Sequence, residues 1–135
     1  MTPSLWLVVR VAHLLAAAIW TGGLVTLGVL VVALRRAGAT REQLRAAARA
    51  FANLSWSGLG VAVATGVVQA TTLRLWGHGA LHVKLALVST MVLLAGVHQL
   101  TARRTSARAR GVIQLGILAL ALGTFVAAAR LAAGA

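Results

Sequence analysis

His13 is the most unusual chemical group in this sequence because it lies deep in an apolar run, VRVAHLLAAAIWTGGLV, from Val9 to Val25. An imidazole can be protonated near neutral pH, and a charge in hydrocarbon is costly. The only acid of the chain is Glu42, so no nearby carboxylate can pair with His13. A neutral imidazole in that place needs a hydrogen-bond partner or a metal. The residue is therefore predicted either to bind a metal or haem, or to hold neighbouring helices in register.

A second group of titratable residues lies in the third apolar run. The 4,3,4,3 spacing predicts that they share one helical stripe, made of Lys84, Val88, Met91, Ala95 and His98. His82 projects roughly opposite Lys84, and His78 belongs to the preceding loop. Each has an ordinary alternative role: Lys84 can extend to the interface, His82 and His78 can be interfacial, and His98 can cap the inner helix end near Arg103.

Haem fits these residues better than a bare metal ion does. Haem b needs an axial nitrogen, an apolar slot and cations for its propionates. His13 is predicted to supply the nitrogen, with Arg10 and Trp20 on its side of the helix, and small residues are predicted to leave the slot. The cations predicted near the propionates are Arg10, Arg74 and Arg130. Copper stays as the alternative, with His13, Lys84 and His82 as candidate ligands, although soft sulfur ligands are nearly absent.

The second axial ligand is predicted from depth in the membrane. At 1.5 Å per residue, His13 lies about 12 Å from the outer end of its span and His98 about 27 Å. Lys84 lies within about 6 Å of the depth of His13 and has a long, flexible side chain. Lys84 is therefore the preferred second ligand, and His98 and His82 remain open alternatives.

The residues that are missing exclude several chemistries. The chain has no cysteine, which excludes disulfides, iron–sulfur clusters and thiolate nucleophiles. A single acid excludes catalysis by paired carboxylates and carboxylate proton relays. No catalytic residue is therefore predicted.

The elements that must position these groups are four apolar segments in a chain of 135 residues that is 60% hydrophobic. They run over about 5–34, 53–73, 80–102 and 111–133, each near the roughly 20 residues that a helix needs to cross a bilayer. Thr2 and Pro3 are typical of a helix start. The sequence predicts an all-α, integral membrane four-helix bundle of up-down-up-down topology, with residues 1–135 as a single domain.

Arginines between the spans predict orientation. The net charge is +12, and the arginines gather in two loops rather than on a soluble basic face, so nucleic acid is not an expected partner. The positive-inside rule places both termini outside the inner (cell) membrane and both arginine-rich loops in the cytoplasm. TREQ, from Thr40 to Gln43, predicts a capping box that begins a short interfacial helix leading into the second span. The stripe of Arg41, Arg45 and Arg49 on that helix is expected to contact anionic headgroups.

Three motifs in combination resemble the copper-resistance D (CopD) type of membrane protein. They are HLLAAAIWTGGL (His13–Leu24), RAFANLSWSGLGVAVATG (Arg49–Gly66) and GALHVKLALV (Gly79–Val88). Leu-His-x-Lys-Leu with a later histidine also resembles the HemJ-type protoporphyrinogen oxidases. That likeness implies haem b, with His13, Lys84 and His98 at matching positions. The chain has TLGVLVVALRR where those oxidases have Pro-Arg and Tyr-His, so protoporphyrinogen oxidation is not expected.

Three functions follow as hypotheses. The leading one is a small b-haem protein that transfers electrons within or across the membrane, with a redox partner or a second copy of itself. The CopD-type likeness implies copper uptake or tolerance as the alternative. The third is a cofactor-free accessory subunit.

Overall fold

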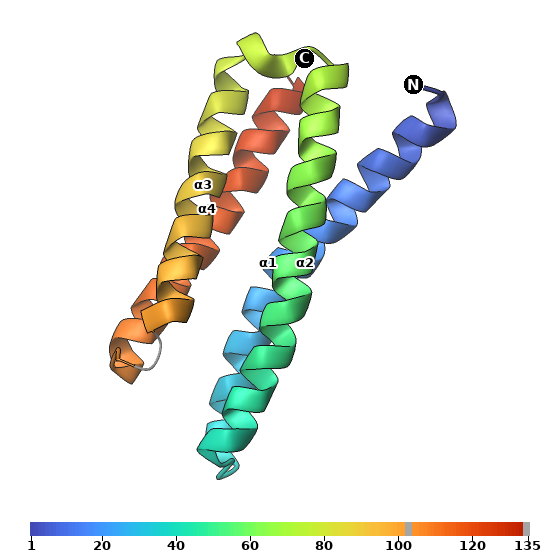
Figure 1. Cartoon of the computed structure of the whole chain (residues 1–135). Helices are drawn as coiled ribbons and strands as arrows, with labels where there is room; N and C mark the ends of the chain where they lie inside the picture. Colours follow the sequence, from blue (N-terminus) through green and yellow to red (C-terminus); the bar gives the residue numbers. More distant parts are fainter. Residues whose placement is uncertain (102–103, 134–135) are drawn as a thin grey trace. The chain divides into compact units, whose positions relative to one another are not determined.

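The computed structural model describes residues 1–101 and 104–133, and four long helices make up most of them (Figure 1). These are α1 (Pro3–Arg36), α2 (Arg41–Thr72), α3 (Gly79–Thr101) and α4 (Ala107–Ala133), with a short 3₁₀ turn, η1, over Leu75–Gly77. All four are long and apolar enough to cross a membrane. The prediction of an all-α, multi-pass membrane protein is confirmed. The predicted end of the third span, at residue 102, lies outside the described residues.

Helix α1 begins as the sequence predicts. Thr2 is the N-cap, its hydroxyl accepts a hydrogen bond from the Leu5 amide at 3.3 Å, and Pro3 occupies the first turn. The helix ends at Arg36, and Gly38 then adopts a φ of 78°, which lets the chain reverse without steric strain. With 34 residues, α1 is about 51 Å long, which exceeds the hydrocarbon thickness of about 30 Å. Part of α1 must therefore tilt or extend beyond the membrane.

Helix α2 begins with the predicted capping box. The Thr40 hydroxyl accepts from the Gln43 amide at 3.2 Å, and the Gln43 side chain accepts from the Thr40 amide at 2.8 Å. The segment predicted as a short interfacial helix leading into the second span is the first part of one helix, which runs from Arg41 to Thr72 without a break. No proline interrupts this segment, so nothing stops the capped helix before it enters the span.

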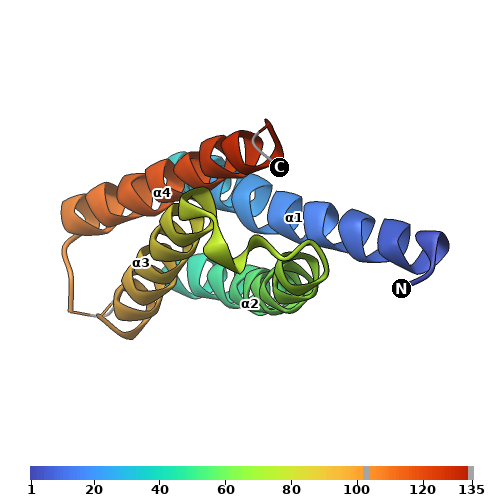
Figure 2. The same ribbon diagram turned by 90° about the horizontal axis from the view of Figure 1, so that it is seen from above.

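The chain forms two compact units, Met1–Leu73 and Arg74–Ala135. In the first, α1 and α2 pack as an antiparallel pair, and small residues mark their close approach. A Cβ placed on Gly23 would overlap the ring of Phe51, and one placed on Gly58 would lie 3.3 Å from Ile19. The N-terminal end of α1 diverges from α2 (Figures 1 and 2). The pair is therefore tightest in its middle and toward the connection between the helices.

In the second unit, α3 and α4 also pack antiparallel. A Cβ on Gly116 would lie 3.6 Å from Leu94, and one on Gly123 would lie 3.7 Å from Leu87. Met91 of α3 and Ile117 of α4 are almost completely buried. This pair is therefore held by aliphatic side chains and glycines that fit against one another.

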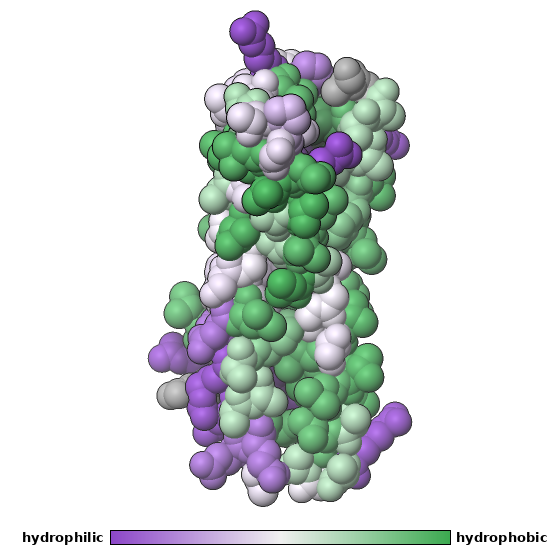
Figure 3. Space-filling model, turned by 90° about the vertical axis from the view of Figure 1, so that its right-hand side faces the viewer, coloured by the Kyte–Doolittle hydropathy of each residue, from purple (hydrophilic) through white to green (hydrophobic). Residues whose placement is uncertain are grey.

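Large hydrophobic side chains are exposed along every helix, as lipid contact requires. Leu7 is 61% exposed, Leu93 70% and Val126 58%. Hydrophobic side chains cover most of the face shown in Figure 3, and hydrophilic ones gather mainly toward its lower end. Such a surface is unfavourable in water and favourable in a bilayer.

Candidate functional site

His13 makes the best-defined polar contact between two helices. Its Nδ1 lies 2.9 Å from the carbonyl oxygen of Ala62 and 3.1 Å from the hydroxyl oxygen of Thr65, both on α2. A carbonyl oxygen can only accept, so Nδ1 must carry the proton and donate it. The Thr65 hydroxyl donates to the Val61 carbonyl at 2.6 Å, which leaves its oxygen able to accept from Nδ1. Every donor in this small network therefore has an acceptor.

The protonated Nδ1 decides what the other ring nitrogen can do. In a neutral imidazole with its proton on Nδ1, the lone pair lies on Nε2. Metal-bound histidines characteristically donate the second ring nitrogen to a backbone carbonyl or carboxylate, which fixes the tautomer and the ring orientation. The bond from His13 to Ala62 is of that kind. The same bond also fastens α1 to α2, so the geometry suits both roles that the sequence predicts for His13.

Gly66 makes room for the imidazole. A Cβ at this position would lie 3.2 Å from Cε1 of His13, which is closer than an ordinary contact. Ala62, Thr65 and Gly66 were not among the site residues predicted from the sequence. The sequence feature that could have indicated them is a hydroxyl next to a glycine, Thr65 and Gly66, within an apolar span. An isolated hydroxyl in a span needs a hydrogen-bond partner, and a glycine allows another helix to approach closely.

Trp20 and Arg10 have different surroundings although both lie near His13 in the sequence. Trp20 is 5% exposed and packs edge-on against Trp56 of α2, with ring centroids 5.8 Å apart. His13 and Trp20 therefore share the face of α1 that contacts α2, as their seven-residue spacing predicts. Arg10 is exposed. Arg74 is exposed too and adopts a left-handed conformation, with φ 55°, after the end of α2.

In α3 the predicted stripe is the less exposed face of the helix. Met91 is 3% exposed, and the other stripe members, Lys84, Val88, Ala95 and His98, are half-buried. His82 is exposed, as is His78 before the helix. His13 and Lys84 belong to different units of the chain, and the pairing of these two residues stays a prediction.

His98 differs from His13 in its hydrogen bonding. Its Nδ1 is buried and has no hydrogen-bond partner among the described residues. Arg110 of α4 lies close enough to interact with it electrostatically. The predicted neighbour Arg103 lies outside the described residues. A buried nitrogen without a partner costs about 1–3 kcal/mol, so this position favours an additional bound group.

Gln69 is a further polar residue near this site, and the sequence did not predict its position there. It lies one helical turn beyond Thr65 on α2, and its Nε2 is buried without a hydrogen-bond partner in the described part of the chain. Residues four apart lie on the same side of a helix, so the Gln69 amide follows the Thr65 hydroxyl along α2. It adds an unused donor on the side of α2 that meets His13.

Two other observations bear on the predicted ligands. Small residues do leave a shallow apolar depression between α1 and α2, bordered by Ala12, Ala16, Ser57 and Gly58 among others, but His13 does not line it. Among the described residues, no three His, Cys, Asp or Glu side chains lie together in a group that could hold a metal ion.

The first two sequence motifs meet at this site. HLLAAAIWTGGL contributes His13 and Trp20 to the contact between α1 and α2, and the second motif contributes both hydrogen-bond acceptors, Ala62 and Thr65, and the space for the ring at Gly66. The chain matches no family model, no curated protein and no solved structure.

Proposed function

We propose that this protein binds a b-type haem in the membrane through His13 and transfers electrons within or across the bilayer. The observation that carries the proposal is the donation from Nδ1 of His13 to the Ala62 carbonyl, at 2.9 Å. It supports the tautomer whose Nε2 can coordinate iron. When bound, haem would supply a one-electron redox couple, which the side chains of this chain do not provide.

The residues around His13 have supporting roles in this proposal. The Ala62 carbonyl and Thr65 hydroxyl hold the imidazole by its other nitrogen, and Gly66 leaves space for the ring. Arg10, on the exposed side of α1 one turn away, is a cation suited to a carboxylate group of the ligand. Trp20, two turns further along α1 than His13, packs against Trp56 of α2. Lys84, or His98 in its place, would be the second residue to hold the haem.

The proposed orientation places both termini outside the cell membrane. Arginines concentrate in the helix ends that flank the connection between α1 and α2, and around the connection between α3 and α4, whereas Arg74 is the only one between α2 and α3. Positive residues are retained on the cytoplasmic side during insertion. A periplasmic reporter fused to the C-terminus should be active, and activity of a cytoplasmic reporter at that end would overturn the orientation.

A cofactor-free accessory role is the second candidate, because the bonds from His13 to Ala62 and Thr65 also serve to fasten two helices. The deciding measurement is the absorption spectrum and the metal content of the purified full-length protein. A Soret band with about one haem per chain supports the leading proposal. Stoichiometric copper without haem would replace it with copper binding, and protein free of both would favour the accessory role.

A further inference from the structure

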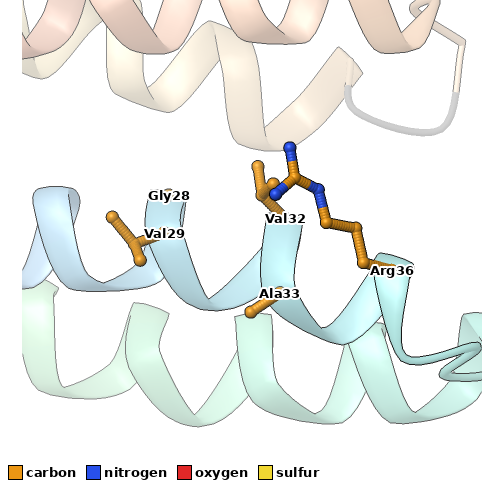
Figure 4. A pocket seen from close by; sticks show the side chains of 5 residues that line it. All are labelled: Gly28, Val29, Val32, Ala33 and Arg36. Atoms are coloured by element: carbon orange, nitrogen blue, oxygen red, sulfur yellow. The ribbon is translucent and has the colours of Figure 1, made fainter.

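Helix α1 carries a shallow groove near its C-terminal end that the His13 site does not use. Its lining residues all belong to α1: Gly28, Val29, Val32, Ala33 and Arg36 (Figure 4). Val32 and Arg36 project from the same side of the helix in this view. The groove therefore has apolar walls and one cationic end, and we call it the Arg36 groove.

The dimensions of the Arg36 groove match a lipid chain within one leaflet. Gly28, Val32 and Arg36 are spaced four apart and so follow one side of the helix. Eight residues at 1.5 Å each span about 12 Å, close to the roughly 15 Å of hydrocarbon in one leaflet. No atom lies within 4 Å of a Cβ placed on Gly28, so open space lies over this glycine. Val29 and Val32 are 67% and 49% exposed and can contact an alkyl chain along their length.

The charge at the end of the groove favours an anionic headgroup. Arg35 and Arg36 form the last turn of α1, and both are exposed. The arginines at the start of α2 add to the positive charge on this side. The chain has 13 basic residues and one acid, so the protein itself cannot neutralise this cluster. A guanidinium pairs well with a phosphate because it can donate two parallel hydrogen bonds.

We propose that the Arg36 groove binds one anionic phospholipid. The phosphate pairs with Arg36 at the arginine-rich membrane surface, and an acyl chain lies along Gly28, Val29, Val32 and Ala33. This site is specific for one lipid molecule, unlike a general attraction of the basic loop for headgroups, because the groove directs the chain and the phosphate together. It is independent of haem binding, since none of its residues contacts the His13 network.

The test compares two lipids and two pairs of variants. Full-length protein in detergent is titrated with phosphatidylglycerol or phosphatidylcholine, and bound lipid is counted by native mass spectrometry. Gly28→Leu fills the groove, and Gly60→Leu is its control, because a Cβ on Gly60 also meets nothing within 4 Å. Arg36→Gln removes the charge, and Arg108→Gln is its control, because Arg108 is an exposed arginine of the other arginine-rich segment, in the first turn of α4.

We expect one phosphatidylglycerol to be retained per chain and phosphatidylcholine to bind more weakly. Arg36→Gln should weaken phosphatidylglycerol binding by roughly fivefold or more, because it removes the charged partner of the phosphate. Gly28→Leu should weaken it by a similar factor, because the leucine occupies the place of the acyl chain. Gly60→Leu and Arg108→Gln should leave it unchanged. Equal retention of both lipids, or equal losses from Arg36→Gln and Arg108→Gln, would overturn the proposal. So would a shift from dimer to monomer in Gly28→Leu, because a second copy would then occupy the groove.

Discussion

The two helix pairs each contain a half-buried histidine, but the hydrogen bonding of that histidine differs between them. In α1 and α2, His13 donates across the interface to a backbone carbonyl and a hydroxyl. In α3 and α4, the described contacts between helices are aliphatic, and Nδ1 of His98 is buried without a partner. The first histidine is held in a fixed tautomer and orientation by its own unit. Nδ1 of His98 lacks a hydrogen-bond partner in the described part of its own unit.

This contrast shows that the position of a histidine in a span does not by itself make it functional. One ring nitrogen is positioned to bind a ligand when the other ring nitrogen donates to a fixed acceptor. A buried ring nitrogen without a partner instead lowers the stability of the fold or favours the binding of an additional group. The four predictions below test this contrast, beginning with the largest expected effect.

Replacing His13 should have the largest effect. His13→Ala removes the proposed iron ligand together with both bonds to α2. The haem-to-protein ratio should fall more than the roughly tenfold to hundredfold that loss of an outer partner of a ligand costs. Haem content is measured from the pyridine haemochrome spectrum after identical purification. His78→Ala is the control, because His78 is exposed and lies before α3. Full haem occupancy in His13→Ala would show that His13 only fastens the helices.

Crowding the imidazole should have the next largest effect. Gly66→Val places side-chain atoms against a ring that two hydrogen bonds hold in place. Overpacking of this kind costs about 1–3 kcal/mol of the free energy of unfolding, and haem occupancy should fall with it. Unfolding in mixed micelles measures the stability. Gly60→Val serves as the matched control, and equal stability of the two variants would mean that the ring moves away freely.

His98→Leu should act in the opposite direction from His13→Ala on the stability of the cofactor-free protein. It removes a buried nitrogen that lacks a partner, so the free energy of unfolding should be unchanged or rise by up to about 1 kcal/mol. The same micelle assay measures it, with His13→Leu as the comparison, which should be destabilised. A clear loss of stability in His98→Leu would indicate that His98 has a partner, and the contrast between the helix pairs would then fail.

Thr65→Val should have the smallest effect. This change keeps the shape of the side chain and removes one of the two acceptors of Nδ1, whereas the Ala62 carbonyl remains. Hydrogen bonds between membrane helices contribute about 0.6 kcal/mol on average, so a stability loss of that size is expected, with haem content unchanged. A strong loss of haem in Thr65→Val would mean that the Thr65 hydroxyl, and not the Ala62 carbonyl, holds the His13 ring in its orientation.

The sequence alone determines the helices and their faces because these depend on local patterns. Apolar runs of sufficient length identify four spans, Thr2 with Pro3 and Thr40 with Gln43 identify two helix starts, and a seven-residue spacing places His13 and Trp20 on one face. Each feature depends on residues within a few turns of one another. Two physical causes produce these features: helical periodicity, and the need of the backbone groups at a helix end for hydrogen-bond partners. Both act within one segment of the chain.

Only the tertiary structure decides which atom meets which across a helix pair. The register of α1 on α2 results from many contacts at once, including the fit of Phe51 over Gly23 and of Ile19 against Gly58. That register places the Ala62 carbonyl opposite His13, and a backbone acceptor has no residue type by which a sequence could identify it. Among the described residues, the packing of the first pair leaves Nε2 of Gln69 without a partner, and that of the second pair leaves Nδ1 of His98 without one. Hydrogen bonding in hydrocarbon depends on which groups face one another as well as on which residues are present.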